Sequence, residues 1–328
     1  MQRANLAIIG GGLVGASLAL ILQAGARERG WRIVLIEPFA PGDAYQPSYD
    51  ARSSALSFGS RQIYERLGLW QRIAQRGEPI SQIHVSDRGR FGSARLTAME
   101  EGVPALGYVV ENAWLGQCLW QALDHEVVSW RCPAEVRRMQ ALDDGYRLTL
   151  DDDSILDCDL AVLADGGRSG LRELPERQFL DELQAAFGYR LGGFRQVGAR
   201  YCYPLTLSEA EEQVRPHLVV LGNAAHSLHP IAGQGFNLSL RDAQALADQL
   251  LGADAAPGDF AVLQRYLEGQ RLDQQMTVGF SDRVTRLFSN AQPVLATGRN
   301  LGLLGLDLLP PAKRWFARQA MGLGARPV

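Results

Sequence analysis

Residues 6–17 have the sequence LAIIGGGLVGAS, in which an apolar run leads into three consecutive glycines and a fourth glycine follows three positions later. Leu6–Ile9 is typical of a buried strand and Leu13–Arg29 of a helix, so the glycines lie in the turn between them. A second, largely apolar run, Arg32–Ile36, predicts a parallel strand and is followed by Glu37. A strand, a glycine turn, a helix, a strand and a final acid form the βαβ unit of a dinucleotide-binding fold.

Each motif glycine of this turn has its own task in such a unit. Gly10 permits the tight turn, Gly12 lets a pyrophosphate approach the backbone, and Gly15 lets the helix pack closely on the strand. The N–H groups and the positive dipole end of the helix can then bind phosphate. Glu37 lies 22 residues after Gly15, which is near the spacing of an acid that binds ribose hydroxyls.

The composition excludes several classes of protein. With 328 residues, of which 46% are hydrophobic and 21% charged, the chain has material for about two domains and is not disordered, collagenous or coiled-coil. A formal net charge of −3 provides no basic surface, so nucleic acid is not an expected partner. The stretch 4–26 carries no charge, but it belongs to the βαβ unit and not to a signal peptide or a membrane span. We therefore expect a cytoplasmic protein.

Cysteine and histidine spacing does not indicate a metal site. The chain has four widely separated cysteines, Cys118, Cys132, Cys158 and Cys202. They suit a reducing compartment, and we interpret them as small buried apolar side chains. His226 and His229 are three positions apart, but no third ligand is nearby and Pro230 interrupts any regular helix. We interpret the two histidines as part of a loop.

Hydrophobic spacing predicts the remaining elements. Ser53–Leu67 fits a helix, with apolar residues at helical spacing. Val127–Asp159 alternates and contains two acidic turns, which predicts a small antiparallel meander. We expect a helix over 176–187, a strand over 194–205, and mainly helices from Gln234 onward.

Two later segments carry further motifs. Residues 157–169, DCDLAVLADGGRS, contain a buried strand over 160–163 and then a turn at Asp165–Gly166. Residues 222–237, GNAAHSLHPIAGQGFN, follow another short buried strand, and their glycines at 233 and 235 open a helix. Because the first N–H groups of a helix have no partner within it, this helix start can bind an anion or a carbonyl.

The three motifs, in this order, resemble those of the class A flavoprotein aromatic hydroxylases. The runs DARSSAL at 50–56 and HPIAGQGFNL at 229–238 are most similar to the ubiquinone-biosynthesis hydroxylases, and among these to the 2-polyprenyl-6-methoxyphenol hydroxylases. The resemblance implies an α/β fold with a Rossmann-like FAD-binding domain of the para-hydroxybenzoate hydroxylase type and with C-terminal helices. It further implies FAD and NAD(P)H as cofactors, and O₂ and a prenylated phenol as substrates.

The resemblance also assigns cofactor-binding residues. Besides Gly10, Gly12, Gly15 and Glu37, it implies that FAD is bound by Arg52, Gln117, Asp165, Gly166, Gly222, Asn223, Gly233, Gly235 and Asn237, and that Pro230, Gly233, Gln234 and Gly235 line the flavin. The family usually has aspartate where this chain has Asn223; an asparagine still bonds a ribityl hydroxyl but adds no charge. The sequence assigns no catalytic side chain, and the oxygen chemistry is centred on the flavin.

The motifs divide the chain into discontinuous domains. We expect an FAD-binding domain at 1–78, 99–173 and 218–290, a remnant of a substrate-binding domain at 79–98 and 174–217, and a C-terminal helical segment at 291–328. In the family that this chain resembles, a substantial sheet lies between the second and third motifs, whereas Gly166 and Gly222 are only 56 positions apart here. The substrate-binding sheet is therefore reduced or incompletely present. We expect that residues are absent near Glu173–Leu174, either deleted from the chain or omitted between them.

Other functions share these motifs. A flavin reductase or dehydrogenase of the same fold would carry all three without hydroxylating a substrate. A non-catalytic FAD-binding partner in a biosynthetic complex would account for the short substrate region.

The C-terminal stretch 300–328 suggests contact with a membrane surface. Six leucines precede Pro310–Pro311, and three cationic residues then accompany Trp315 and Phe316. Cationic and aromatic residues on one short helix suit a bilayer interface, and a helix packed on the FAD domain is the alternative. On the first interpretation the protein is peripheral on the inner membrane.

Overall fold

The computed structural model describes residues 2–39, 52–87, 90–165, 208–228, 233–289 and 292–323, together with six isolated positions between 180 and 196. The chain divides into a larger unit, 1–166 with 207–328, and a smaller unit, 167–206. In the smaller unit Leu180 and Gln184 are helical, within the segment for which the sequence predicts a helix.

The junction at Glu173–Leu174 and most of the predicted strand over 194–205 lie outside the described residues. The expectation that residues are absent near Glu173–Leu174 therefore stays a prediction.

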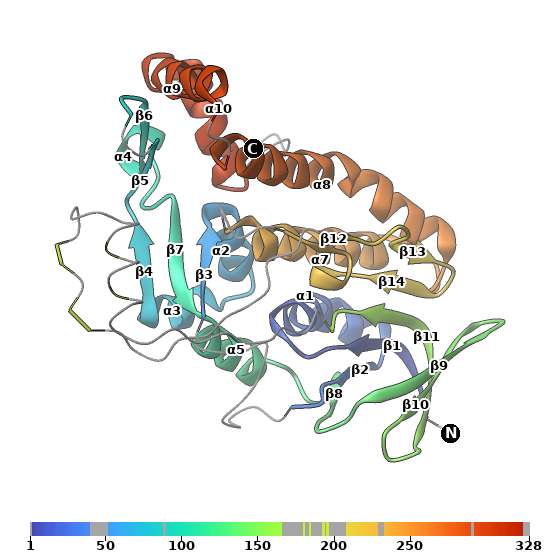
Figure 1. Ribbon diagram of the computed structural model, residues 1–328. Coiled ribbons are helices and arrows are strands. Elements are labelled where there is room, and N and C mark those ends of the chain that lie inside the picture. The colour runs from blue at the N-terminus through green and yellow to red at the C-terminus, as the bar shows by residue number, and fades with distance from the viewer. Residues whose placement is uncertain are drawn as a thin grey trace. The chain divides into compact units, whose positions relative to one another are not determined.

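A parallel sheet lies at the centre of the larger unit (Figure 1). Its strands are β1 (Gln2–Ile9), β2 (Ile33–Ile36), β8 (Val128–Arg131), β11 (Ile155–Leu163) and β14 (Leu218–Val220). Their order is β14-β11-β1-β2-β8, and β13 (Val214–Arg215) is antiparallel to β14 at the edge. In β1 the side chains of Leu6 and Ile8 enter one hydrophobic cluster and that of Ala7 enters another. The strand is thus buried on both faces, as its unbroken apolar sequence predicts.

Helices cover one face of this sheet (Figure 1). They are α1 (Leu13–Arg29), α5 (Asn112–Gln121), α7 (Gln234–Gly252) and α8 (Phe260–Phe288). α1 packs against both α5 and α7, and α7 packs against α8. α1 has the bounds that the sequence predicts, and it ends at Gly30 in the left-handed conformation, with φ 67°. Its position directly after β1 places the glycine turn at the end of the sheet.

The described residues contain further strands and helices. β9 (Val136–Leu142) and β10 (Gly145–Leu150) pack on the other face of the parallel sheet. A second sheet consists of β3 (Ser53–Ser57), β7 (Gly107–Glu111) and β4 (Gly77–Ile80), in that order. Two further sheets have two strands each. One pairs β5 (Gln82–Ser86) with β6 (Ser93–Thr97), and the other pairs β12 (Ser208–Glu209) with β15 (His226–Ser227). The short helices are α2 (Phe58–Arg66), α3 (Trp70–Ile73), α4 (Ala98–Glu101), η1 (Ala74–Arg76) and η2 (Gly222–Ala224). The chain continues through α9 (Pro293–Leu308) and α10 (Pro310–Ala320).

The predicted helix over 53–67 is wrong in its first five residues, which form β3. β3 pairs along its whole length with β7, and this pairing with a distant segment outweighs the local helical spacing. The helix α2 begins at Phe58, where the Ser57 hydroxyl accepts a hydrogen bond from the N–H of Ser60.

The predicted meander over 127–159 is partly wrong. β9, β10 and β11 are antiparallel neighbours, as expected. β8, at the start of the segment, instead pairs in parallel with β2. The end of the meander and the predicted buried strand over 160–163 are one strand, β11, so β11 joins the meander to the parallel sheet.

Two of the cysteines are buried, as expected. Cys118 and Cys158 are fully buried, whereas Cys132 is half-buried and Cys202 lies outside the described residues. Burial raises the pKa of the Cys158 thiol to about 12. The Cys158 thiol is therefore protonated at neutral pH and is not a nucleophile.

Polar side chains hold α9 on the β5–β6 hairpin. The Asp87 carboxylate accepts hydrogen bonds from Arg299 Nη2 at 2.6 Å and Asn300 Nδ2 at 2.9 Å. Asn300 Oδ1 accepts a further bond, from the N–H of Gly92, at 2.7 Å. Arg299 and Asn300 are both buried. Burial opposes ionisation of Asp87, but the bonds from Arg299 and Asn300 outweigh it and hold its pKa below the usual value.

We predict that Asp87→Ala lowers the free energy of unfolding by about 3 kcal/mol at pH 7, because the buried Arg299 guanidinium loses its carboxylate. Since the pKa of Asp87 is lowered by folding, its contribution is complete above the unfolded value of about 4 and is lost as the pH falls through the folded value. Urea unfolding of wild type and variant at a series of pH values measures this difference. Asp282→Ala, which removes only the exposed pair with Arg286, is the control and is expected to cost less than about 0.5 kcal/mol. Equal stability of wild type and Asp87→Ala at pH 7 would contradict the assignment.

Candidate cofactor site

The sequence motifs meet at the carboxyl edge of the parallel sheet. Ile9 at the end of β1 is paired with the last residue of β2 and with the last residue of β11, whose own partner is the last residue of β14. The four strands therefore end level with one another. Within two positions of these ends lie four of the predicted residues, Gly10, Glu37, Asp165 and Gly222. Ligands of open α/β sheets bind at this edge.

The glycine turn after β1 has no room for side chains. Gly10 has φ +104°, and a Cβ there would lie 2.5 Å from the carbonyl oxygen of Ala164. A Cβ on Gly15 would lie 1.9 Å from the carbonyl oxygen of Gly10. Gly12 is the N-cap of α1, which has no side-chain cap and no acid in its first turn. The first N–H groups of α1 therefore stay available to an anion.

Glu37 is fixed against this turn. Its Oε2 accepts a hydrogen bond of 2.7 Å from the N–H of Gly11, and its Oε1 accepts one of 3.2 Å from the N–H of Phe39. The residue is 5% exposed. Burial raises the pKa of the carboxyl group, and the two backbone bonds oppose that rise. Gly11 was not among the predicted site residues, although its place in the glycine run was a signal for it.

A second helix begins at an uncapped glycine. Gly233, the N-cap of α7, has φ 61°, and α7 likewise has no side-chain cap and no acid in its first turn. A Cβ on Gly233 would lie 3.0 Å from the Cβ of Ala55 in β3. The start of α7 therefore packs closely against β3, and no side-chain cap uses the first N–H donors of α7.

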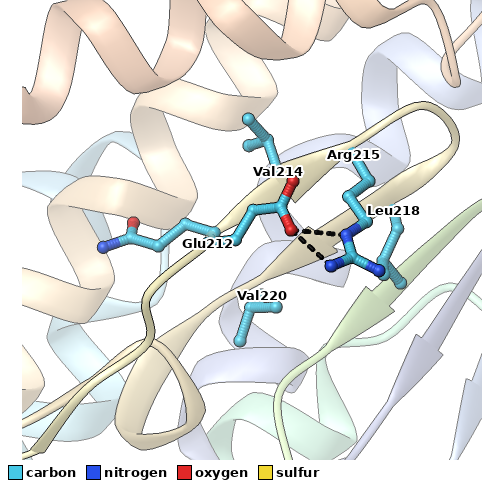
Figure 2. Close-up of a pocket in the computed structure, with 6 residues that line it drawn as sticks. Glu212, Val214, Arg215, Leu218 and Val220 are labelled. Carbon is cyan, nitrogen blue, oxygen red and sulfur yellow. Dashed lines mark hydrogen bonds and ion pairs between the residues drawn. The ribbon is translucent and has the colours of Figure 1, made fainter.

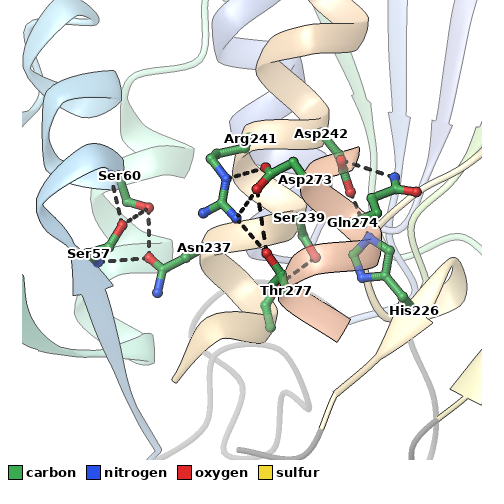
Figure 3. Close-up of polar contacts among 11 residues, drawn as sticks. Ser57, Ser60, His226, Asn237, Ser239, Arg241, Asp242, Asp273, Gln274 and Thr277 are labelled. Carbon is green, nitrogen blue, oxygen red and sulfur yellow. Dashed lines mark hydrogen bonds and ion pairs between the residues drawn. The ribbon is translucent and has the colours of Figure 1, made fainter. Parts of the chain in front are cut away.

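Asn237 joins α7 to β3 and α2 (Figure 3). Its Nδ2 donates to the carbonyl oxygens of Ala55 at 2.8 Å and Gly233 at 2.7 Å. Its Oδ1 accepts from the N–H of Ser57 at 2.8 Å and from the hydroxyl of Ser60 at 2.7 Å. The buried amide thus makes four hydrogen bonds within the protein. These bonds fix the position of Gly233, where α7 begins.

The Gln234 side chain is directed at the C-terminal helices. Its Nε2 donates to the carbonyl oxygen of Ala320 at 3.1 Å, and the residue is buried. Close by, the N–H of Gly59 donates to the carbonyl oxygen of Met321 at 2.9 Å. The predicted flavin-lining segment is therefore in direct contact with the end of α10.

The other predicted residues lie at the surface of the larger unit or outside the described ranges. Asp165 and Asn223 are exposed, near the ends of β11 and β14. Arg52 is exposed before β3, and its carbonyl oxygen accepts a bond of 2.8 Å from the N–H of Asn112 at the start of α5. Gln117 is exposed on α5. Gly235 is half-buried in the first turn of α7, and Gly166 and Pro230 lie outside the described residues.

His226 belongs to a buried network that the sequence motifs did not reveal (Figure 3). Its Nε2 lies 2.6 Å from Asp242 Oδ2, and both residues are at most 1% exposed. Asp242 Oδ1 accepts a bond from Gln274 Nε2 at 3.1 Å. Burial and the charge of Asp242 raise the pKa of Tyr266 well above its usual value. His226 lies in β15 and not in a loop as expected, and the network ties this strand to α7 and α8. Within the described ranges no cluster of three metal-ligating side chains exists.

A small cavity of about 120 Å³ lies at the β13–β14 hairpin (Figure 2). It is lined by Glu212, Gln213, Val214, Arg215, Leu218 and Val220. The ion pair between Glu212 and Arg215 crosses it. A dinucleotide needs several times this volume, so the cavity is separate from the site at the glycine turn.

Comparison with known proteins places the chain among flavoproteins. The FAD binding domain family matches residues 3–184 and 208–279. A ubiquinone hydroxylase of Rhodospirillum rubrum is 31% identical over 99% of this chain and 91% of its own length. The 3-demethoxyubiquinol 3-hydroxylase of Escherichia coli is 29% identical over 98% of this chain and 99% of its own length.

The relatives carry residues that this chain lacks. The alignment with the Rhodospirillum rubrum protein runs over 397 positions, whereas this chain has 328 residues. The family match is interrupted at 185–207, between the second and third motifs. A region between these motifs that is shorter than in the relatives stays a prediction.

Solved structures have the same fold. The p-nitrophenol 4-monooxygenase of Pseudomonas putida has a TM-score of 0.79 at 16% identity, with 100% of both chains covered. The anhydrotetracycline hydroxylase of Streptomyces rimosus has a TM-score of 0.78 at 16% identity, with 100% of this chain and 77% of its own covered. These likenesses confirm the expected α/β FAD-binding fold. The chain therefore belongs to the FAD binding domain family and, within it, to the ubiquinone hydroxylases.

Proposed function

We propose that this chain is an FAD-dependent monooxygenase that uses NAD(P)H and O₂ to hydroxylate a polyprenylated phenol in ubiquinone biosynthesis. The proposal rests on one observation. The glycine turn, Glu37 and the segment 222–228 lie together at one edge of the sheet. The names of the relatives, a ubiquinone hydroxylase and a 3-demethoxyubiquinol 3-hydroxylase, support the class of reaction and a prenylated ring as substrate.

FAD fits the groups at this edge. The pyrophosphate would bind the uncapped N–H groups of α1 beside Gly12, and Glu37 would accept bonds from ribose hydroxyls. Asp165 and Asn223, exposed near neighbouring strand ends, would bond the remaining hydroxyls. The flavin would lie toward the start of α7, whose free N–H groups stabilise negative charge on its ring. Arg52 and Gln117 complete the proposed set.

The chemistry is divided between the cofactor and the chain. When bound, FAD takes a hydride from NAD(P)H and activates O₂, so that one oxygen atom enters the ring as a hydroxyl and the other leaves as water. The chain binds and orients the cofactor. Asn237 holds the start of α7 in place, and the His226–Asp242 pair joins β15 to α7.

The proposed substrate also suggests where the protein works. A polyprenylated phenol partitions into a bilayer, so we propose a cytoplasmic protein that contacts the inner membrane peripherally, alone or in a biosynthetic complex. Among the described residues no helix is both long and apolar enough to span a membrane.

The proposal predicts oxidation of NAD(P)H that is stimulated by a prenylated phenol, with a product heavier by one oxygen atom. Absorbance at 340 nm and mass spectrometry of the product measure the two effects. Rapid oxidation of NAD(P)H with a reduced but unhydroxylated product would instead identify a reductase. FAD binding without turnover would identify a non-catalytic partner, which the shortened region between the motifs favours as the second candidate.

We predict that Gly12→Val loses FAD while the fold persists. Gly12 has φ −64° and ψ −171°, an extended conformation that valine adopts without backbone strain, and the valine side chain would stand where the pyrophosphate approaches the turn. The flavin content after purification should fall below about a tenth of the wild-type value, with the melting temperature of the apoprotein unchanged within about 2 °C. Gly279→Val, at a helical glycine with open space around it, is the control. Full flavin content in Gly12→Val would exclude the phosphate-binding role of the turn.

We predict that Glu37→Gln weakens FAD binding about tenfold or more at pH 8, because the ribose loses a charged acceptor. The apoprotein should also lose stability, because the amide has one acceptor oxygen and its NH₂ group would face one of the two backbone N–H groups that the carboxylate accepts from. Burial raises the pKa of Glu37, so the uncharged amide escapes the cost of burying a charge, and this gain offsets part of the loss. Flavin titration and thermal unfolding measure the two effects. Loss of stability without loss of FAD affinity would show that Glu37 serves only the turn.

A further inference from the structure

The polarity of α9 is partly reversed relative to that of an ordinary surface helix, because its buried side holds Ala296 and Leu303 but also two polar residues. The side that faces β5 and β6 carries Arg299 and Asn300, which are 7% and 1% exposed. The side that faces solvent carries Val294, Leu301 and Leu308, which are 83%, 57% and 68% exposed. A surface helix normally buries its apolar stripe and exposes its polar residues.

Leu301, Leu304 and Leu308 form a stripe of exposed apolar residues on α9, and Val294 lies in line with it beyond the exposed Thr297 and Gly298. Val294, Leu301 and Leu308 are seven residues apart, which is close to two helical turns and places them above one another. Leu304, also partly exposed, fills the interval between the last two. The bonds from Arg299 and Asn300 to Asp87 fix the rotation of the helix, so the leucines cannot turn inward without breaking them.

Exposed apolar residues follow the stripe along the chain into α10. Leu309, between the two helices, is 58% exposed, and Trp315 on α10 is also 58% exposed. Arg314 and Arg318 are four residues apart, so they lie above one another on α10, and both are exposed, as is Trp315 next to Arg314. We call these residues together the α9–α10 face: Val294, Leu301, Leu304, Leu308, Leu309, Arg314, Trp315 and Arg318.

The charge of the α9–α10 face is positive. α10 carries no acidic residue. Its one lysine, Lys313, is paired with Glu100 and Asp307, whereas Arg314 and Arg318 have no acidic partner among the residues that the structure describes. Apolar side chains with an exposed tryptophan and unpaired arginines beside them match the layers of a bilayer surface, which has acyl chains beneath anionic headgroups.

We propose that the α9–α10 face docks on the surface of an anionic phospholipid bilayer. This inference rests on the proposed function, since it supplies the surface from which a prenylated phenol would be taken. The contact between Ala320 at the end of α10 and Gln234 at the start of α7 keeps the docking helices beside the flavin-lining segment. A second copy of this chain would cover the apolar stripe equally well but would set the unpaired arginines of the two copies against each other.

Flotation of the FAD-loaded protein with vesicles tests this inference. The vesicles are pure phosphatidylcholine, or phosphatidylcholine with 30% phosphatidylglycerol, and the variant is Leu301→Glu/Leu308→Glu. The matched control is Ile155→Glu/Leu272→Glu, which places the same charges at two exposed apolar positions outside the face. Arg314→Ala/Arg318→Ala tests the electrostatic part.

We expect the wild type and the control to float with the anionic vesicles, and the leucine variant to lose about tenfold or more of the bound fraction. The arginine variant should lose the preference for anionic over neutral vesicles, and wild-type binding should weaken with added NaCl. Wild type that remains unbound to both vesicles, or a leucine variant that floats like wild type, would overturn the inference. A third outcome would also overturn it: light scattering shows that the wild type is a dimer and the leucine variant a monomer, while the two proteins float equally well.

The outcome does not depend on turnover. FAD content and NAD(P)H oxidation, measured without vesicles, report on the proposed function separately. Failed hydroxylation with intact flotation counts against the enzyme assignment, whereas intact hydroxylation of a soluble phenol with failed flotation counts only against the docking face.

Discussion

Backbone hydrogen bonding between β1 and its two parallel neighbours is the constraint on which the rest of the structure depends. The ladder continues just beyond the strand ends: the N–H of Gly10 donates to Ile36 at 2.9 Å, and that of Ala164 donates to Ile9 at 2.7 Å. These bonds hold the turns after three strands at one level. A register shift of one residue would reverse the side chains of β1 between the two hydrophobic clusters, so the core that fixes the register also fixes the position of the site.

A second constraint acts on the other side of the site. The start of α7 depends on Asn237, whose amide is fully used by groups of β3, α2 and α7 itself. A buried amide with all its partners satisfied is rigid, because any displacement leaves polar atoms unpaired in a site that water does not reach. A flexible glycine N-cap thus receives its orientation from a residue one turn further along the helix.

The comparison of sequence and structure separates local from distant information. The βαβ unit was predictable, including both ends of α1, because its glycines, its apolar runs and Glu37 lie within a single stretch of chain. The strand at Ser53–Ser57 was not, because its partner β7 is distant in sequence and its own spacing is compatible with a helix. The same limit applies to side chains. The sequence marked Asn237 and Gln234 as members of a motif, but their partners, Ser57, Ser60 and Ala320, come from other segments.

The bond between Gln234 and the carbonyl oxygen of Ala320 has a thermodynamic consequence. It joins the first turn of the proposed cofactor helix to the last turn of the helices that carry the α9–α10 face. Should lipid bound at the α9–α10 face alter this bond, the two sites would be linked, and the factor by which lipid changes the affinity for flavin would be the factor by which flavin changes the affinity for lipid. The fraction of protein on a bilayer would then report its cofactor occupancy, and newly folded apoprotein would differ from the loaded protein in where it resides.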